Sequence, residues 1–342
     1  MSTEATSALT FNDLIKEVAR AIGVGYYGST GDGALQIPTD AYDLDECKRL
    51  INNGIRMFIN DAPPGGWRWM RPIGTFALWP DITTSTPSTL TAGSYDSTND
   101  QTKLTAAADA FYGTMEEKAI AVTGGSSYTI KQYIDAKNVY VYGDASGMAA
   151  SSTWTMASNS AFTLPRTFGG QVNGEITFAF QTDRGIYITW CDETVIRQWR
   201  SNLQYESGTP LYAAVRPFQG TGQRRRWELL VYPEPDEVLS VEFPYTIQFD
   251  LLSNTTDVPL SPVDHDEALK AACIATAEKD VEDMMGPKMS YYQQRCLPES
   301  YRIDSMSAPR RLGYFGNAPK TLPTLRDWRQ QWMQRPPVTF NP

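Results

Sequence analysis

The spacing of apolar residues predicts two helices near the N-terminus. Between residues 10 and 23, apolar side chains recur at steps of three and four, which places them on one face of an α-helix. Thr10 and Asp13 form a capping-box sequence at the start of this helix, and Gly23 marks its end. A second helix with the same periodicity is predicted from about Asp43, and Pro63 prevents it from continuing.

Two further helices are predicted downstream. One begins at Asp192. The other has Ser261 as its cap, Pro262 in its first position and Asp264 in its first turn, an order that suits the free amides and the helix dipole. This last helix carries many small side chains, so another helix of the same chain or of a neighbouring subunit can approach it closely. The residues concerned are Ala268, Ala271, Ala272 and Ala275.

The region between the second and third helices has a different pattern. Residues 73–190 are poor in charge and rich in Ser, Thr, Tyr and Gly, and segments 118–143 and 174–190 alternate as strands do. Residues 225–247 contain two strand-like runs separated by a proline-containing turn, which predicts an additional hairpin. Beyond Pro298 the chain has little periodicity, and an extended segment is expected.

These elements predict an α+β fold: a helical bundle of about four helices with an inserted β-barrel-like domain, an additional β-hairpin and an extended C-terminal arm. The predicted domain boundaries follow from the change in pattern along the chain. They are 1–72 for the first part of the helical domain, 73–190 for the inserted β-domain, 191–298 for the segment that completes the helical domain, and 299–342 for the basic arm.

Charge is distributed unevenly along the 342 residues. The net charge is -9, but residues 301–342 contain seven Lys and Arg against two Asp, which leaves -14 for residues 1–300. An acidic body of this kind disfavours adhesive binding to DNA. The four cysteines are far apart and form no C-x-x-C pair, which favours reduced thiols over disulfides or a zinc site. No apolar run reaches the length of a membrane span, so we expect no membrane association.

The sequence predicts no catalytic, cofactor or metal site. The G-x-G-x-x-G string at residues 23–28 follows a predicted helix, whereas the dinucleotide fingerprint follows a strand. Asp264, His265 and Asp266 lie in the first turn of a predicted helix, where carboxylates are favoured by the dipole alone. His265 is the single histidine, and no G-x-S-x-G sequence accompanies it. We therefore expect a protein that is not an enzyme.

Two basic segments are candidate contact sites. Arg224, Arg225 and Arg226 precede a predicted strand, where they would contact phosphate in a channel or, alternatively, form a solvated edge or a salt-bridge site between subunits. In the arm, two indoles and a methionine have helical spacing and are surrounded by arginines, which predicts a short amphipathic anchor for a partner. An alternative is that the arm folds back on its own body or on an adjacent subunit. The anchor residues are Arg326, Trp328, Arg329, Trp332, Met333 and Arg335.

Several stretches resemble a known family when they are taken in order. The segment RLINNGIRMFINDAPPGGWRWMRP at residues 49–72 is followed by SGTPLYAAVRP, WELLVYPEPDE, VEFPYTIQFDLLSNTTDVPLSP and HDEALKAACIATAEKD. This order and spacing resemble bacteriophage head-to-tail adaptor proteins, the connectors that lie beneath the portal. The resemblance covers roughly residues 8–72 and 162–290.

The resemblance implies a structural virion protein of the head-tail junction that assembles in the host cytoplasm. Such adaptors form a ring, commonly a dodecamer, that binds the portal protein on one side. On the other side they bind the next tail component, a nozzle, stopper or tail tube, and double-stranded DNA passes through the central channel. The arm would contact the portal. An alternative function is a tail-associated carbohydrate or receptor-binding protein that uses the Ser/Thr/Tyr-rich β-domain.

Overall fold

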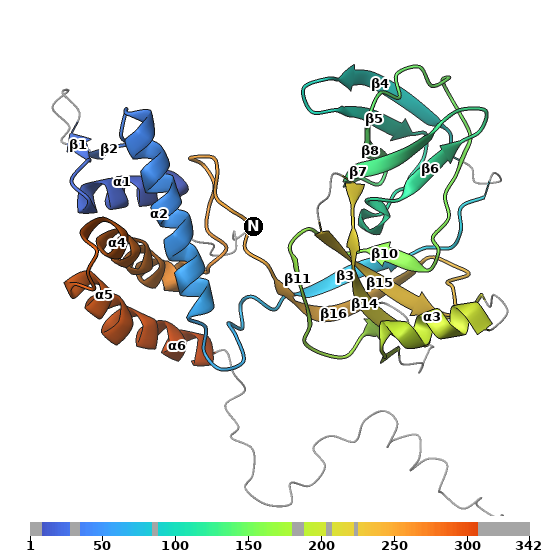
Figure 1. Ribbon diagram of the computed structural model, residues 1–342. Helices are drawn as coiled ribbons and strands as arrows, with labels where there is room; N and C mark the ends of the chain where they lie inside the picture. The colour runs from blue at the N-terminus through green and yellow to red at the C-terminus, as the bar shows by residue number, and fades with distance from the viewer. Residues whose placement is uncertain are drawn as a thin grey trace, which may run out of the picture. The chain divides into compact units, whose positions relative to one another are not determined.

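The computed structural model describes residues 9–27, 35–83, 88–179, 188–202, 207–221 and 225–306. The chain forms two compact units, which are coloured along the chain in Figure 1. The helical unit contains the described residues up to Pro64 together with those from Ser261 onward. The β unit contains the described residues from Gly65 to Leu260.

The first and second helices form largely as the sequence predicts. Thr10 and Asp13 make the predicted capping box, in which each side chain accepts a hydrogen bond from the other's backbone amide. The Thr10 hydroxyl also donates to the Asp13 carboxylate at 2.6 Å, and this hydrogen bond, together with the one from the Thr10 amide, lowers the pKa of Asp13. Gly23 follows the helix with a φ of +82°, a conformation that glycine adopts without strain. The second helix starts two residues earlier than predicted, after Asp40, whose carboxylate accepts from the amide of Tyr42 at 2.8 Å.

The C-terminal part of the helical unit differs from its prediction. A 3₁₀ turn precedes the fourth helix, which begins at Asp266, and the Ser261 side chain makes no capping hydrogen bond. Residues 299–306, expected in the extended arm, are helical. A π-helical turn lies directly before this segment and accommodates Pro298, which has no backbone N–H to donate.

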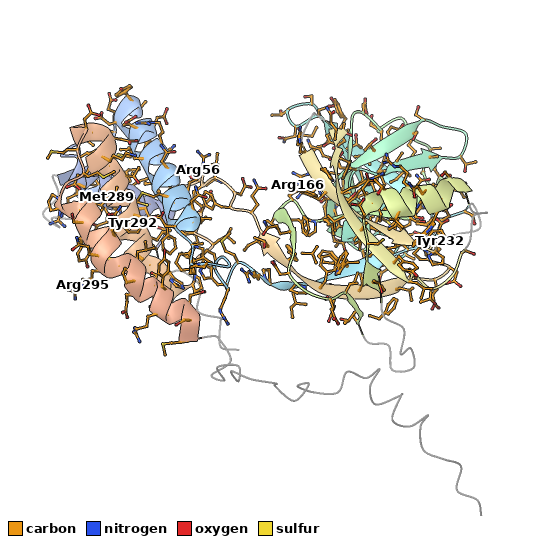
Figure 2. All side chains as sticks on the ribbon, turned by 60° about the horizontal axis from the view of Figure 1, so that its bottom comes forward. Arg56, Arg166, Tyr232, Met289, Tyr292 and Arg295 are labelled. Carbon is orange, nitrogen blue, oxygen red and sulfur yellow. The ribbon has the colours of Figure 1, made fainter. Side chains whose placement is uncertain are left out.

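The helical unit contains five α-helices and a two-stranded ribbon among the described residues. Its elements are α1 (Phe11–Ala21), β1 (Tyr26–Tyr27), β2 (Leu35–Gln36), α2 (Ala41–Asn60), α4 (Asp266–Glu282), α5 (Pro287–Tyr291), the π turn (Tyr292–Cys296) and α6 (Leu297–Met306). Tyr292, labelled in Figure 2, is buried in this unit and donates from its hydroxyl to the carboxylate of Asp61 at 2.8 Å. That hydrogen bond joins the π turn to the end of α2.

The β unit contains three sheets. One has six strands in the order β4-β5-β8-β7-β6-β9; a second has the order β10-β15-β14-β13, and in the third β16 pairs with β11, β12 and β3. The strands are β3 (Ile73–Leu78), β4 (Leu90–Asp96), β5 (Gln101–Ala106), β6 (Ala119–Val122), β7 (Ser127–Asp135), β8 (Asn138–Tyr142), β9 (Trp154–Thr155), β10 (Ala161–Thr163), β11 (Phe168–Val172), β12 (Thr177–Phe178), β13 (Thr189–Trp190), β14 (Tyr212–Gln219), β15 (Arg225–Tyr232) and β16 (Leu239–Ile247). The helix α3 (Glu193–Asn202) belongs to the same unit.

The predicted fold class, a helical bundle with an inserted β-domain and a separate hairpin, is wrong. The protein is mostly β, and strands after residue 190 belong to the same unit as those before it. The antiparallel pairs between β10 and β15, and between β11 and β16, connect these two regions of sequence. Long-range strand pairing therefore places the segment 207–260, expected to complete the helical domain, in the β unit.

The additional hairpin at residues 225–247 is also absent, although both of its strands exist. β15 pairs with β10 and β14, whereas β16 pairs with strands of another sheet. Leu229, Leu230 and Val231 are consecutive and all buried, so β15 needs apolar cover on both of its faces. β15 instead forms an antiparallel hairpin with β14.

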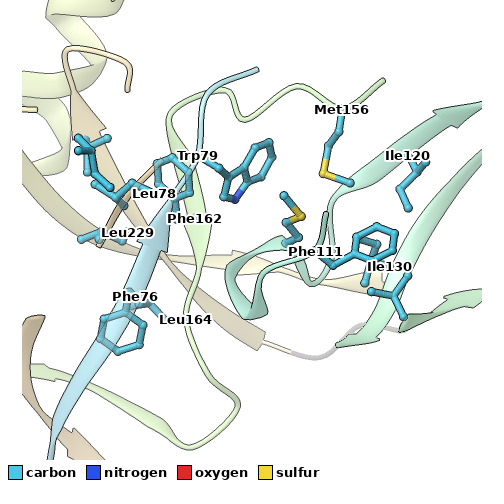
Figure 3. Close-up of a cluster of buried hydrophobic side chains, with 14 of the residues drawn as sticks. Phe76, Leu78, Trp79, Phe111, Ile120, Ile130, Met156, Phe162, Leu164 and Leu229 are labelled. Atoms are coloured by element: carbon cyan, nitrogen blue, oxygen red, sulfur yellow. The ribbon is translucent and has the colours of Figure 1, made fainter. Parts of the chain in front are cut away.

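All three sheets of the β unit contribute to one hydrophobic core, part of which Figure 3 shows. Trp79 packs edge-on against Phe162 with ring centroids 5.7 Å apart. Phe111 and Trp154 stack at 5.5 Å, and the Trp154 indole donates to the carbonyl of Ser88 at 2.8 Å. Because aromatic residues of several sheets share this core, the sheets form a single folding unit.

Candidate functional site

Helices α2 and α4 of the helical unit approach each other closely at Gly54. A Cβ atom added to Gly54 would lie 2.5 Å from the Cα atom of Cys273, a distance that real Cβ atoms essentially never show. The Cys273 thiol lies 3.7 Å from the carbonyl oxygen of Ile51, to which it donates weakly. Burial raises the pKa of this thiol to about 12, so Cys273 is protonated at neutral pH and acts as a small packing residue.

The small-residue set predicted on α4 is buried. Helices α1, α2 and α5 all contact α4 within the same chain. The small side chains therefore pack against helices of the same chain. The sequence alone was compatible with packing against either the same chain or a neighbouring subunit. The four residues and their exposed fractions are Ala268 at 3 %, Ala271 at 5 %, and Ala272 and Ala275 at 0 %.

His265 lies in the 3₁₀ turn before α4, with its ring 6.1 Å from that of Phe58. Burial lowers the pKa of the imidazole, and the nearby carboxylates, led by that of Asp304, act in the opposite direction. Because burial is the larger effect, the neutral imidazole is favoured. The neighbouring Asp266 occupies the first turn of α4, as the dipole argument predicts.

The arginines at the start of β15 have different environments. Arg224 lies outside the described residues, and Arg225 is exposed. Arg226 is 6 % exposed, and its guanidinium lies 2.7 Å from the carboxylate of Glu116 and 3.8 Å from that of Glu117. It also donates to the carbonyl of Leu164 at 3.2 Å. Arg226 is therefore part of a buried ion-pair cluster that holds the turn before β6 against β15.

A second buried ion-pair cluster lies on the same strand. Glu228 accepts from Arg216 at 2.6 Å, and the ammonium of Lys118 lies 3.4 Å from the same carboxylate. Burial lowers the pKa of Lys118, and the negative charge of Glu228 opposes that shift. Arg226 and Glu228 are two residues apart on β15 and so point to the same face of the strand. That spacing is a local sequence signal for this network, whereas Lys118 and Glu116 lie 110 residues away from their partners on β15.

The arm residues Arg326, Trp328, Arg329, Trp332, Met333 and Arg335 all lie outside the described residues. Within the described part of the chain, no three His, Cys, Asp or Glu side chains come close enough to hold a metal ion. Among the same residues, no helix has the length and apolar character required to cross a bilayer.

No protein-family model matches the sequence, and a search of curated proteins finds no significant match.

Proposed function

We propose that the protein is a bacteriophage head-to-tail adaptor, a structural component of the virion without catalytic activity. One observation supports this proposal most directly. Residues 49–60 and 266–280, which carry much of the resemblance, belong to α2 and α4, and these helices pack at backbone contact. Two stretches separated by about two hundred residues of sequence thus pack together, which supports their belonging to one structural unit of an adaptor.

In this proposal, copies of the chain form a dodecameric ring at the head-tail junction and leave a channel for double-stranded DNA. The net charge of -14 on residues 1–300 supports a conduit, because like charge reduces adhesion of the DNA backbone. The basic arm, with Trp328 and Trp332, would bind the portal protein. The next tail component would bind the opposite side of the ring.

The oligomeric state of the full-length protein tests the proposal. We expect light scattering after size exclusion to give the mass of a ring, either for the protein alone or after addition of portal, and electron micrographs to show a central opening. A monomer that does not bind the portal protein but is retained by immobilised glycans would instead favour the carbohydrate-binding alternative. A monomer that binds neither would contradict both functions.

A further inference from the structure

A pocket of about 740 Å³ opens on the β unit and has a charge opposite to that of the protein. The whole chain contains 30 cationic and 39 acidic side chains. In contrast, the residues that line this pocket include four cations and two carboxylates. They come from distant segments of sequence and are Glu117, Lys131, Arg166, Arg225, Arg226 and Asp250.

Glu117 lines the buried part of the pocket, and its carboxylate connects several of the surrounding segments. One of its carboxylate oxygens accepts from the amide of Thr221 at 2.8 Å, and the other accepts from the hydroxyl of Tyr142 at 3.1 Å and lies 3.8 Å from Arg226. Glu117 has a φ of +63°, a strained conformation for a residue with a side chain. Such strain persists where the surroundings fix the residue, and it is concentrated at functional sites. A Cβ atom at Gly220 would lie 3.1 Å from the Glu117 carboxyl carbon, so glycine provides the space for this carboxylate.

The positive charge in the interior is already compensated. Arg226 lies between the carboxylates of Glu116 and Glu117, with its closer contact to Glu116. The two carboxylates balance the buried positive charge without a ligand, and among the described residues the Arg226 Nε alone of this guanidinium's nitrogens has no hydrogen-bond or ion-pair partner. Arg226 therefore acts as a support for the pocket, and the groups that remain for a ligand are those nearer to solvent.

The outer part of the pocket has cations in excess. Arg166, labelled in Figure 2, donates to the carbonyl of Lys131 at 2.8 Å and lies 3.7 Å from Glu116, a carboxylate it shares with Arg226. The Lys131 ammonium donates to the carbonyl of Asn99, an uncharged partner, and lies 5.6 Å from the centre of the Tyr142 ring. Among the described residues, no carboxylate forms an ion pair with Lys131 or with the exposed Arg225. These three cations line one pocket and are only partly neutralised.

We propose that this pocket binds the phosphate group of a nucleotide, either free or within a DNA strand. Two guanidinium groups offer the paired N–H donors that match phosphate oxygens, and a lysine adds a point charge. The pocket is larger than a phosphate ion, and the partly exposed ring of Phe249 lines it, which suits stacking of a base. The site would exist whether or not the protein forms a ring.

Calorimetric titration of the full-length protein tests this assignment, with inorganic phosphate, thymidine monophosphate and a short single-stranded DNA as ligands at low salt. We expect phosphate and the nucleotide to bind. The double variant Arg166→Ala/Arg225→Ala should weaken nucleotide binding roughly ten- to a hundredfold, as expected for loss of charge-assisted hydrogen bonds. The matched control is Arg197→Ala on α3, which removes an exposed arginine, 66 % exposed, outside the pocket.

The competition experiment identifies the source of the phosphate. Displacement of the nucleotide by the single-stranded DNA would assign the site to DNA, and nucleotide binding without displacement would assign it to a free nucleotide. Absence of binding by all three ligands would overturn the proposal. Equal weakening in the double variant and in Arg197→Ala would also overturn it, because the effect would then reflect general charge.

Discussion

The helical unit and the β unit are stabilised in different ways. In the helical unit, α2 and α4 approach until Gly54 meets the backbone of Cys273, and the ion pair between Glu46 and Arg49 lies toward solvent. In the β unit, large aromatic rings fill the core and charged groups such as Arg226 are buried with their partners. We therefore expect the stability of the helical unit to fall when a substitution adds side-chain volume between α2 and α4. We expect the stability of the β unit to fall when a substitution removes a buried charge.

The largest effect is expected from Arg226→Met in the β unit. This variant leaves Glu116 and Glu117 in the interior without their closest cation, and removing one partner of a buried pair costs about 3–5 kcal/mol. Urea denaturation would measure the loss. Arg197→Met on α3 removes an exposed arginine paired with Glu193 and should change the free energy of unfolding by less than about 1 kcal/mol. Similar losses in the two variants would show that burial of the charge has no special role.

The next effect is expected from Gly54→Ala in the helical unit. In an exposed helix this substitution would stabilise by up to about 1 kcal/mol, because alanine favours the helix. Here the new methyl group meets the Cys273 backbone at 2.5 Å, so we expect destabilisation of roughly 2–3 kcal/mol from overpacking.

Gly147→Ala in the β unit is the matched control for that substitution. A Cβ atom at Gly147 meets nothing within 4 Å, so its stability should change little. The two variants can be compared by urea denaturation under the same conditions. An unchanged or raised stability for Gly54→Ala would mean that α2 and α4 are not in backbone contact.

The smallest of these effects is the pH dependence that arises from His265. Burial lowers the pKa of the folded imidazole below its unfolded value near 6.5. As pH falls through that unfolded value, the unfolded chain takes up a proton that the folded protein resists, so stability decreases. The difference in stability between wild type and His265→Gln should therefore shrink as pH falls from 8 to about 5. A difference that is constant over this range would show that the histidine titrates alike in both states.

Local signals were predictable from the sequence, and long-range pairing was not. The capping box of Thr10 and Asp13, and the stop at Pro63, depend on residues within one turn of each other. The partner strands of β15 are set by residues far away in the sequence. The proline-containing turn after β15 led to the wrong prediction that β15 pairs with β16, whereas it pairs with β10 and β14. That error made the fold class wrong, because the strands after residue 190 were separated from their partners.

The candidate sites show the same limit. The small residues on α4 are visible in the sequence, but their burial within one chain could not be predicted from it. That burial depends on α1 and α2, which come from the other end of the sequence. Of the residues that line the proposed phosphate pocket, the sequence indicated only Arg225 and Arg226, as parts of a candidate phosphate contact that also included Arg224. Its remaining residues converge from separate strands and loops, and the positive φ of Glu117 leaves no pattern in the sequence.

Attachment to heads tests the central claim, that this chain joins a filled phage head to its tail, most directly. Tailless, DNA-filled heads that lack the protein would be incubated with the full-length chain, and co-sedimentation would be measured. We expect the full-length protein to sediment with the heads, and a chain without residues 320–342, which include Trp328 and Trp332, to fold but remain in the supernatant. Full-length protein that stays unbound to heads with an exposed portal would contradict the proposed function.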